Sequence, residues 1–111
     1  MTTSGSDLPL SGRVAIVTGA GGGLGRAHAL YLASQGAAVV VNDLVIEPAQ
    51  AVVREIEQGG GTALAVAASV ADEGAVEAMV RQVLDQWGRI DILINNAGIL
   101  RDKSFAKMSL E

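Results

Sequence analysis

The residues best suited to chemistry form a glycine-rich stretch, Thr-Gly-Ala-Gly-Gly-Gly-Leu-Gly, which runs from Thr18 to Gly25. It follows an apolar run, 14–17, that predicts a buried strand, and it continues into 26–32, which predicts a helix. Glycines between a strand and a helix let the backbone approach a phosphate closely, and the unpaired N–H groups and the dipole of the helix start favour negative charge. The stretch therefore predicts a site for a diphosphate.

The spacing of the glycines separates three kinds of phosphate-binding loop. The pattern Gly-x-Gly-x-x-Gly fails, because counting from Gly19 puts Leu24 at the third glycine. Counting from Gly21 puts Arg26 there, and no Lys-Ser or Lys-Thr pair follows as a Walker loop requires. The pattern that fits is Thr-Gly-x-x-x-Gly-x-Gly, with Thr18, Gly19, Gly23 and Gly25 at its fixed positions. A flexible loop without a ligand is the alternative interpretation of these glycines taken alone.

A carboxylate stands where a nucleotide-binding fold would need one. Asp43 ends the second apolar run, 18 residues after Gly25, and there it can accept hydrogen bonds from the ribose hydroxyls of adenosine. The same charge would repel a 2′-phosphate, and neither Leu44 nor Gly22 offers a base to bind one. The sequence therefore favours NAD over NADP, and a solvated acid at the end of a strand is the alternative.

The elements that must position these residues alternate between strands and helices. Apolar runs predict strands at 13–17, 37–41, 62–67 and 90–94. Helices are predicted from the glycine loop to about Gln35, from Pro48 to the glycines at 59–61, and from the cap Asp72 to Trp87. Short connections between them predict an α/β fold, a Rossmann-like doubly wound parallel sheet truncated after its fourth strand, in the order 3-2-1-4. The glycine loop, Asp43, Ser69 and Asn95 would all lie at the carboxyl edge of that sheet.

Length and composition restrict the remaining possibilities. The 111 residues carry a net charge of −4, which argues against nucleic acid or an anionic membrane surface as a partner. No cysteine is present and His28 is the only histidine, so neither a thiolate site nor a metal site is predicted. Residues 1–9 predict a short disordered lead without a secretory signal, and 10–111 predict one cofactor-binding domain of a cytoplasmic protein.

The glycine loop and the segment Asn95-Asn96-Ala97-Gly98 together resemble the short-chain dehydrogenase/reductase family, of which the chain looks like the N-terminal half. Further segments at 12–14, 40–44, 88–91 and 95–105 are similar to the (3R)-3-hydroxyacyl-CoA dehydrogenase domain of multifunctional β-oxidation enzymes. The resemblance implies cofactor contacts at Thr18, Gly19, Gly21, Gly23, Leu24, Gly25, Asp43, Ser69, Val70, Asn95, Ala97 and Gly98. Ser69-Val70 stands where many members carry Asp-Val and use the acid near the adenine amino group.

The activity that the resemblance implies is the NAD-dependent oxidation of 3-hydroxyacyl-CoA to 3-oxoacyl-CoA, with an acyl-CoA-like small molecule as substrate. The family's catalytic Tyr-x-x-x-Lys and serine are not found, since Tyr31 is the only tyrosine and Gln35 stands where the lysine would be. We expect the catalytic residues, and the helices of the family's usual homo-oligomer interface, to lie after Glu111. The chain alone should then bind NAD weakly and be inactive. The alternatives are a 3-oxoacyl-acyl-carrier-protein reductase, which Ile99–Asp102 also resembles, and a non-catalytic nucleotide-binding fragment.

Overall fold

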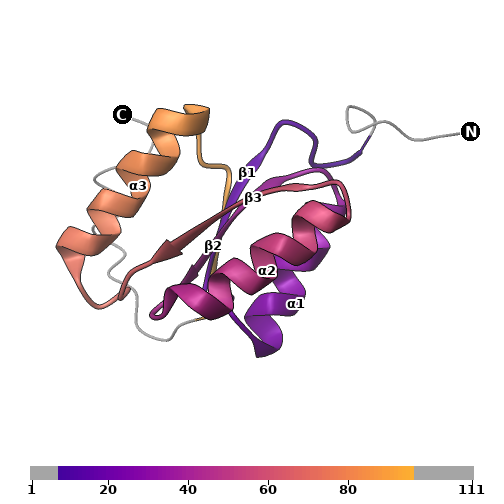
Figure 1. Cartoon of the computed structure of the whole chain (residues 1–111). Coiled ribbons are helices and arrows are strands. Elements are labelled where there is room, and N and C mark those ends of the chain that lie inside the picture. The colour runs from indigo at the N-terminus through magenta and orange to yellow at the C-terminus, as the bar shows by residue number, and fades with distance from the viewer. Residues whose placement is uncertain (1–7, 97–111) are drawn as a thin grey trace, which may run out of the picture.

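The computed structural model describes residues 8–96, and Figure 1 shows that they form a sheet between helices. The strands are β1 (Val14–Thr18), β2 (Ala38–Asp43), β3 (Thr62–Ala67) and β4 (Ile92–Asn95). The helices are α1 (Gly23–Ser34), α2 (Ile46–Gln58) and α3 (Glu73–Trp87). Most of the predicted lead, 1–9, and the whole of 97–111 lie outside the described residues.

The four strands are parallel and lie in the order β3-β2-β1-β4, which confirms the predicted α/β, Rossmann-like topology. Helices α1 and α2 cover one face of the sheet and α3 covers the other, as Figure 1 shows. This division follows from right-handed crossovers. The chain moves outward twice, from β1 to β2 and then to β3, and it then crosses back over the sheet through α3 to reach β4.

Strand β1 lies in the centre of the molecule and is buried along its whole length. Ala15 and Val17 pack in the cluster that includes α1 and α2, whereas Val14 and Ile16 pack in the cluster that includes α3. Because successive side chains of a strand point to opposite faces, a strand covered on both faces must be apolar at every position. The continuous apolar run 14–17 therefore allows β1 to be buried on both faces at the centre of the sheet.

Several element bounds differ from the prediction by a few residues. Strands β1 and β2, predicted at 13–17 and 37–41, are Val14–Thr18 and Ala38–Asp43. Helix α1 begins at Gly23, inside the glycine loop, and α2 begins at Ile46, two residues before Pro48. A proline is accepted in the first turn because that turn's N–H groups have no acceptor within the helix. Strand β4 spans Ile92–Asn95, where 90–94 was expected, because the left-handed cap of α3 at Gly88 leads into a short connection before pairing begins.

An ion-pair cluster ties the amino ends of β1 and β4 together. The carboxylate of Asp91 accepts a hydrogen bond from the backbone N–H of Val14 at 2.8 Å and two more from the Arg89 guanidinium, each at 2.8 Å. The hydrogen bonds from Arg89, helped by that from Val14, lower the pKa of Asp91 from 3.8 to about 2. The cluster therefore fixes where β4 starts, at the end of the sheet opposite the glycine loop.

Candidate functional site

The glycine loop joins β1 to α1 through a close backbone contact. A Cβ built on Gly25, in the first turn of α1, would lie 2.1 Å from the carbonyl oxygen of Gly19. No side chain fits between these two backbones, which is why the third glycine of the pattern is needed. The contact places the first N–H groups of α1 directly beyond the end of β1.

The start of α1 carries no side chain that would neutralise its N–H groups. Gly22 is the N-cap and makes no side-chain cap hydrogen bond, and no acidic residue lies in the first turn. By contrast, α3 is capped by Asp72, whose Oδ1 accepts a hydrogen bond from the N–H of Ala75 at 3.1 Å. The first N–H groups of α1 therefore present uncompensated positive polarity at the carboxyl edge of the sheet, where an anion is stabilised.

Asp43 holds the glycine loop from the neighbouring strand. Its Oδ2 accepts a hydrogen bond from the N–H of Gly21 at 2.8 Å, and its Oδ1 accepts one from the N–H of Leu44 at 2.7 Å. A carboxylate oxygen has more than one lone pair, so each can still accept a second hydrogen bond. The predicted ribose acceptor thus lies within hydrogen-bond distance of the loop predicted to bind the diphosphate.

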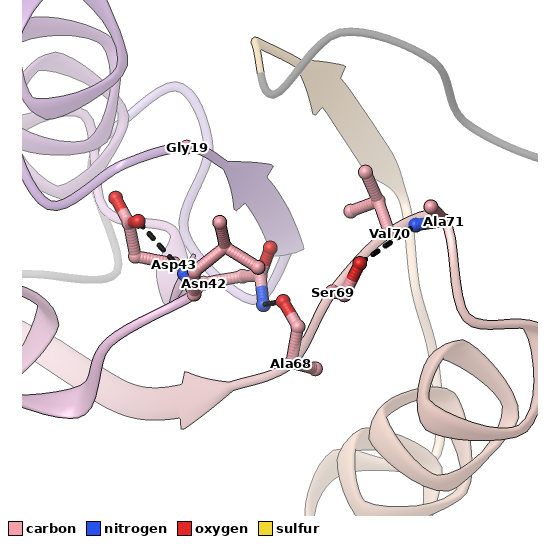
Figure 2. Close-up of a pocket in the computed structure, with 8 residues that line it drawn as sticks. Gly19, Asn42, Asp43, Ala68, Ser69, Val70 and Ala71 are labelled. Carbon is pink, nitrogen blue, oxygen red and sulfur yellow. Dashed lines mark hydrogen bonds between the residues drawn. The ribbon is translucent and has the colours of Figure 1, made fainter.

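A pocket of about 350 Å³ opens beside Asp43, between the ends of β2 and β3 (Figure 2). Its volume is at the lower end of the range of small-molecule sites. Leu44, which is 69% exposed, and Val70, which is buried, give it apolar surface, and the carboxylate of Asp43 gives it charge. The pocket is lined by Gly19, Asn42, Asp43, Leu44, Ala68, Ser69, Val70 and Ala71.

The hydroxyl of Thr18 connects β1 to the end of β4. It donates to Oδ1 of Asn95 at 2.9 Å and accepts a hydrogen bond from the N–H of Asn96 at 3.0 Å. Thr18 is fully buried whereas Asn95 is exposed, so the joint is shielded from water on the Thr18 side only. The first residue of the glycine pattern and the first two residues of the Asn-Asn-Ala-Gly segment are therefore in direct contact, although 77 residues separate Thr18 from Asn95.

The predicted site residues fall into three groups at the carboxyl edge. Gly19, Asp43, Ser69 and Val70 line the pocket, and Gly21 is bonded to Asp43 beside it. Thr18 and Asn95 form the joint described above, while Gly23, Leu24 and Gly25 make the first turn of α1. Ala97 and Gly98 lie outside the described residues. Between residues 8 and 96 there is no cluster that could hold a metal ion, and no helix there is long and apolar enough to cross a bilayer.

Four pocket residues were not assigned to the site by the sequence analysis, namely Asn42, Leu44, Ala68 and Ala71, and of these Asn42 is the polar one. Its side chain is 1% exposed, and its Nδ2 donates to the carbonyl oxygens of Val66 at 3.1 Å and Ala68 at 3.2 Å. Its Oδ1 is buried and accepts no hydrogen bond from the described residues. A signal was present, because the asparagine directly follows an apolar run that predicts a strand covered on both faces, where a polar side chain needs buried partners.

Comparisons with known proteins agree with this geometry. A family model described as short chain dehydrogenase matches residues 13–111. Peroxisomal multifunctional enzyme type 2 of Mus musculus is 50% identical over 115 residues, covering 96% of this chain and 15% of that protein. The 3-oxoacyl-[acyl-carrier-protein] reductase of Synechocystis sp. is 48% identical over 103 residues, covering 92% of this chain and 42% of that protein.

Solved structures agree as well. A metagenomic short-chain oxidoreductase, crystallised in complex with NADP, superposes with a TM-score of 0.78 at 46% identity, covering 81% of this chain and 41% of that one. The chain thus spans 15% to 42% of the length of the three proteins compared. Because the family model matches nearly all of the sequence and the fold superposes at this level of identity, the chain belongs to the short chain dehydrogenase family.

Proposed function

We propose that this chain binds NAD and is the cofactor-binding part of an oxidoreductase that converts 3-hydroxyacyl-CoA to 3-oxoacyl-CoA. The observation that carries the proposal is the position of Asp43, hydrogen-bonded to the glycine loop and lining the pocket. A carboxylate at this point suits the two hydroxyls of an adenosine ribose and disfavours a 2′-phosphate. The next residue, Leu44, brings no positive charge that would reverse this preference.

The residues present fit a dinucleotide. The N–H groups of Gly23, Leu24 and Gly25 would hold the diphosphate, because the first turn of a helix leaves its donors without partners. The pocket beyond Asp43 would hold the adenosine, and side chains at Gly21 or Gly25 would obstruct the loop: a Cβ on Gly21 would lie 2.8 Å from Asp43 Oδ2. When bound, NAD would supply the acceptor for the hydride that leaves C3 of the substrate, the hydroxyl proton being lost separately.

The substrate class rests on the relatives. The mouse protein is named a multifunctional enzyme of the peroxisome, and the resemblance of the sequence to (3R)-3-hydroxyacyl-CoA dehydrogenase domains points the same way. No Tyr-x-x-x-Lys occurs in the 111 residues, so the role proposed for them is to bind and orient the cofactor. Oxidation of 3-hydroxybutyryl-CoA by the protein that contains this chain, followed by NADH absorbance, tests the substrate.

The cofactor preference can be tested by calorimetric titration with NAD and NADP. Replacing Asp43 with Asn keeps the shape of the side chain but removes its charge and one acceptor. Hydrogen bonds to charged groups contribute about 1.5–3 kcal/mol, so NAD affinity should fall about tenfold or more while NADP affinity does not fall. Asp85→Asn, which changes an exposed acid on α3 by the same charge, is the matched control and should leave both affinities unchanged. A wild-type chain that prefers NADP would contradict the assignment to NAD.

A second function, the reduction of 3-oxoacyl-acyl-carrier-protein, is favoured by the name of the Synechocystis relative. Reductases of that kind usually take NADP, so the same titration separates the two proposals. The cytoplasmic location and the homo-oligomeric state of the whole protein also stay predictions. Imaging of the tagged full-length protein, beside a peroxisomal marker, would test the location.

A further inference from the structure

An ion pair joins the start of α1 to α2. The Nε of Arg26 donates to Oε1 of Glu55 at 2.8 Å, and its Nη2 donates to Oε2 of the same carboxylate. The guanidinium and the carboxylate thus meet through two parallel hydrogen bonds, a geometry that fixes the direction of both groups. These bonds raise the pKa of Arg26 and lower the pKa of Glu55, so both groups are charged at neutral pH.

The place of Arg26 in the chain connects this ion pair to the glycine loop. Both side chains are partly exposed, at 43% and 39%, and an ion pair of this kind contributes little to the stability of a fold. Arg26 directly follows residues 23–25, whose N–H groups would hold the diphosphate, and its own N–H donates to the carbonyl oxygen of Gly22 at 3.1 Å. A force on the Arg26 side chain therefore acts on the turn that carries these donors.

The partner residue, Glu55, is fixed to the hydrophobic core. It directly precedes Ile56, which is 4% exposed and packs in the core cluster on the α1 and α2 face of the sheet. The two helices lie against each other on this face (Figure 1). Glu55 therefore gives the guanidinium a fixed point of attachment, and the ion pair relates the start of α1 to the core under α2.

The apolar contacts of α1 begin one turn later than the ion pair. Its buried side chains are those of Ala29 and Leu32, whereas the side chain of Leu24 in the first turn is 67% exposed. The close contact of Gly25 with Gly19 limits how near the first turn can come to β1, but it does not attract the turn. An attractive tie at the start of α1 is therefore needed to hold the turn in one place, and the ion pair provides it.

We propose that Arg26 is a positioning residue, whose ion pair with Glu55 holds the first turn of α1 where its N–H groups can bind the cofactor's diphosphate. This inference rests on the proposed function, since it assumes that the diphosphate binds at that turn. The guanidinium stays on Glu55 when the dinucleotide binds, and the carboxylate balances its charge. The alternative is a guanidinium that turns to the phosphates and binds them directly. The two arrangements predict opposite effects of removing Glu55.

The experiment is a titration of the chain and its variants with ADP and with adenosine. Arg26→Ala and Glu55→Ala both break the ion pair, and alanine suits a helix at either position. Each should weaken ADP binding by about threefold or more, although one variant removes a positive charge and the other a negative one. The double variant should bind ADP about as well as the weaker single variant, because a broken ion pair cannot be broken again. Arg54→Ala and Glu57→Ala, which change exposed residues of the same types on α2, are the controls and should leave ADP binding unchanged.

Adenosine separates positioning of the diphosphate donors from a general loss of structure. It lacks phosphates, so its affinity should stay within about twofold of the wild-type value in every variant. Tighter binding of ADP by Glu55→Ala overturns the inference, because a freed guanidinium would then bind phosphate directly. Equal losses of ADP and adenosine affinity also overturn it, by assigning the ion pair to the stability of the fold. Unchanged ADP binding in both single variants overturns it too and leaves the proposed function intact. If the wild type binds no ADP, the proposed function itself fails, and this inference fails with it.

Discussion

Three glycines of the loop should respond very differently to alanine, although they lie within four positions of one another. At Gly22 an added Cβ meets nothing within 4 Å and φ is −173°, an extended conformation that any residue adopts. At Gly23 the space is open but φ is +56°, in the left-handed region. At Gly25 the Cβ would lie 2.1 Å from the carbonyl oxygen of Gly19 and 3.0 Å from the Cα of Ala20.

The costs can be worked from these contacts. Gly22→Ala should change the free energy of unfolding by no more than about 0.5 kcal/mol. Gly23→Ala should lower it by about 1 kcal/mol, the cost of a left-handed alanine. Carbon-to-oxygen contacts are ordinarily about 3.3 Å, so Gly25→Ala forces the loop and α1 apart by roughly 1 Å, which should cost about 2–3 kcal/mol. The same displacement moves the helix N–H groups that would bind the diphosphate, so NAD affinity should fall as well.

The free energies of unfolding of the three variants can be measured by urea titration, with the fluorescence of Trp87 as the signal. Trp87 is the only tryptophan in the sequence, and it packs against the core cluster under α3, so its emission reports on the loss of the native core. The expected ranking of stability is Gly22→Ala, then Gly23→Ala, then Gly25→Ala. A Gly25→Ala variant within 0.5 kcal/mol of the wild type, or a Gly22→Ala variant as unstable as Gly25→Ala, would refute the close-contact argument.

Two further changes test the ties between β1 and β4. Asp91→Asn removes the carboxylate that Arg89 holds, and it should lower the free energy of unfolding at pH 7 by about 1–2 kcal/mol after solvent screening is allowed for. Because the pKa of Asp91 is depressed to about 2, this stabilisation is present above pH 4 and is lost as the pH falls toward 2, so urea titrations of wild type and variant should converge there. Thr18→Val keeps the shape but removes the hydroxyl bonded to Asn95 and Asn96, and it should cost about 1–3 kcal/mol. Faster hydrogen exchange at the Asn96 amide would support that reasoning, and unchanged exchange would contradict it.

The topology could be predicted from the sequence because its determinants are local. The continuous apolar run at 14–17 indicates a strand covered on both faces, and caps such as Asp72 and Gly88 mark where helices begin and end. Short connections and right-handed crossovers then leave few arrangements of four parallel strands. The start of α1 was less predictable, because glycine has a poor helix propensity and the turn that begins at Gly23 is set by contact with β1.

The site was predictable only in part, because its finer contacts depend on side-chain direction. The sequence places Asp43 at the end of a strand, but not the hydrogen bond from Gly21 that connects it to the glycine loop. The sequence also places Asn42 within a buried strand. It does not show that the amide nitrogen has hydrogen-bond acceptors while the amide oxygen has no donor among the described residues. The contact of Asp43 depends on how β1 and its loop lie against β2, and the contacts of Asn42 depend on the register of β2 against β3. No spacing within a single strand determines either.

The joint at Thr18 also bears on the order in which the molecule assembles. Strand β1 meets β2 across 24 residues, from Val14 to Ala38, but it meets β4 across 77, from Ala15 to Ile92. Closing the longer loop costs about 1 kcal/mol more in chain entropy. During synthesis the segment through Asp43 is made before Asn95, and N-terminal parts of a chain generally fold first. We therefore expect β1 and β2, with Asp43 at the carboxyl edge of the sheet, to pair early. The buried hydroxyl of Thr18 would form its hydrogen bonds with Asn95 and Asn96 only at the end of folding.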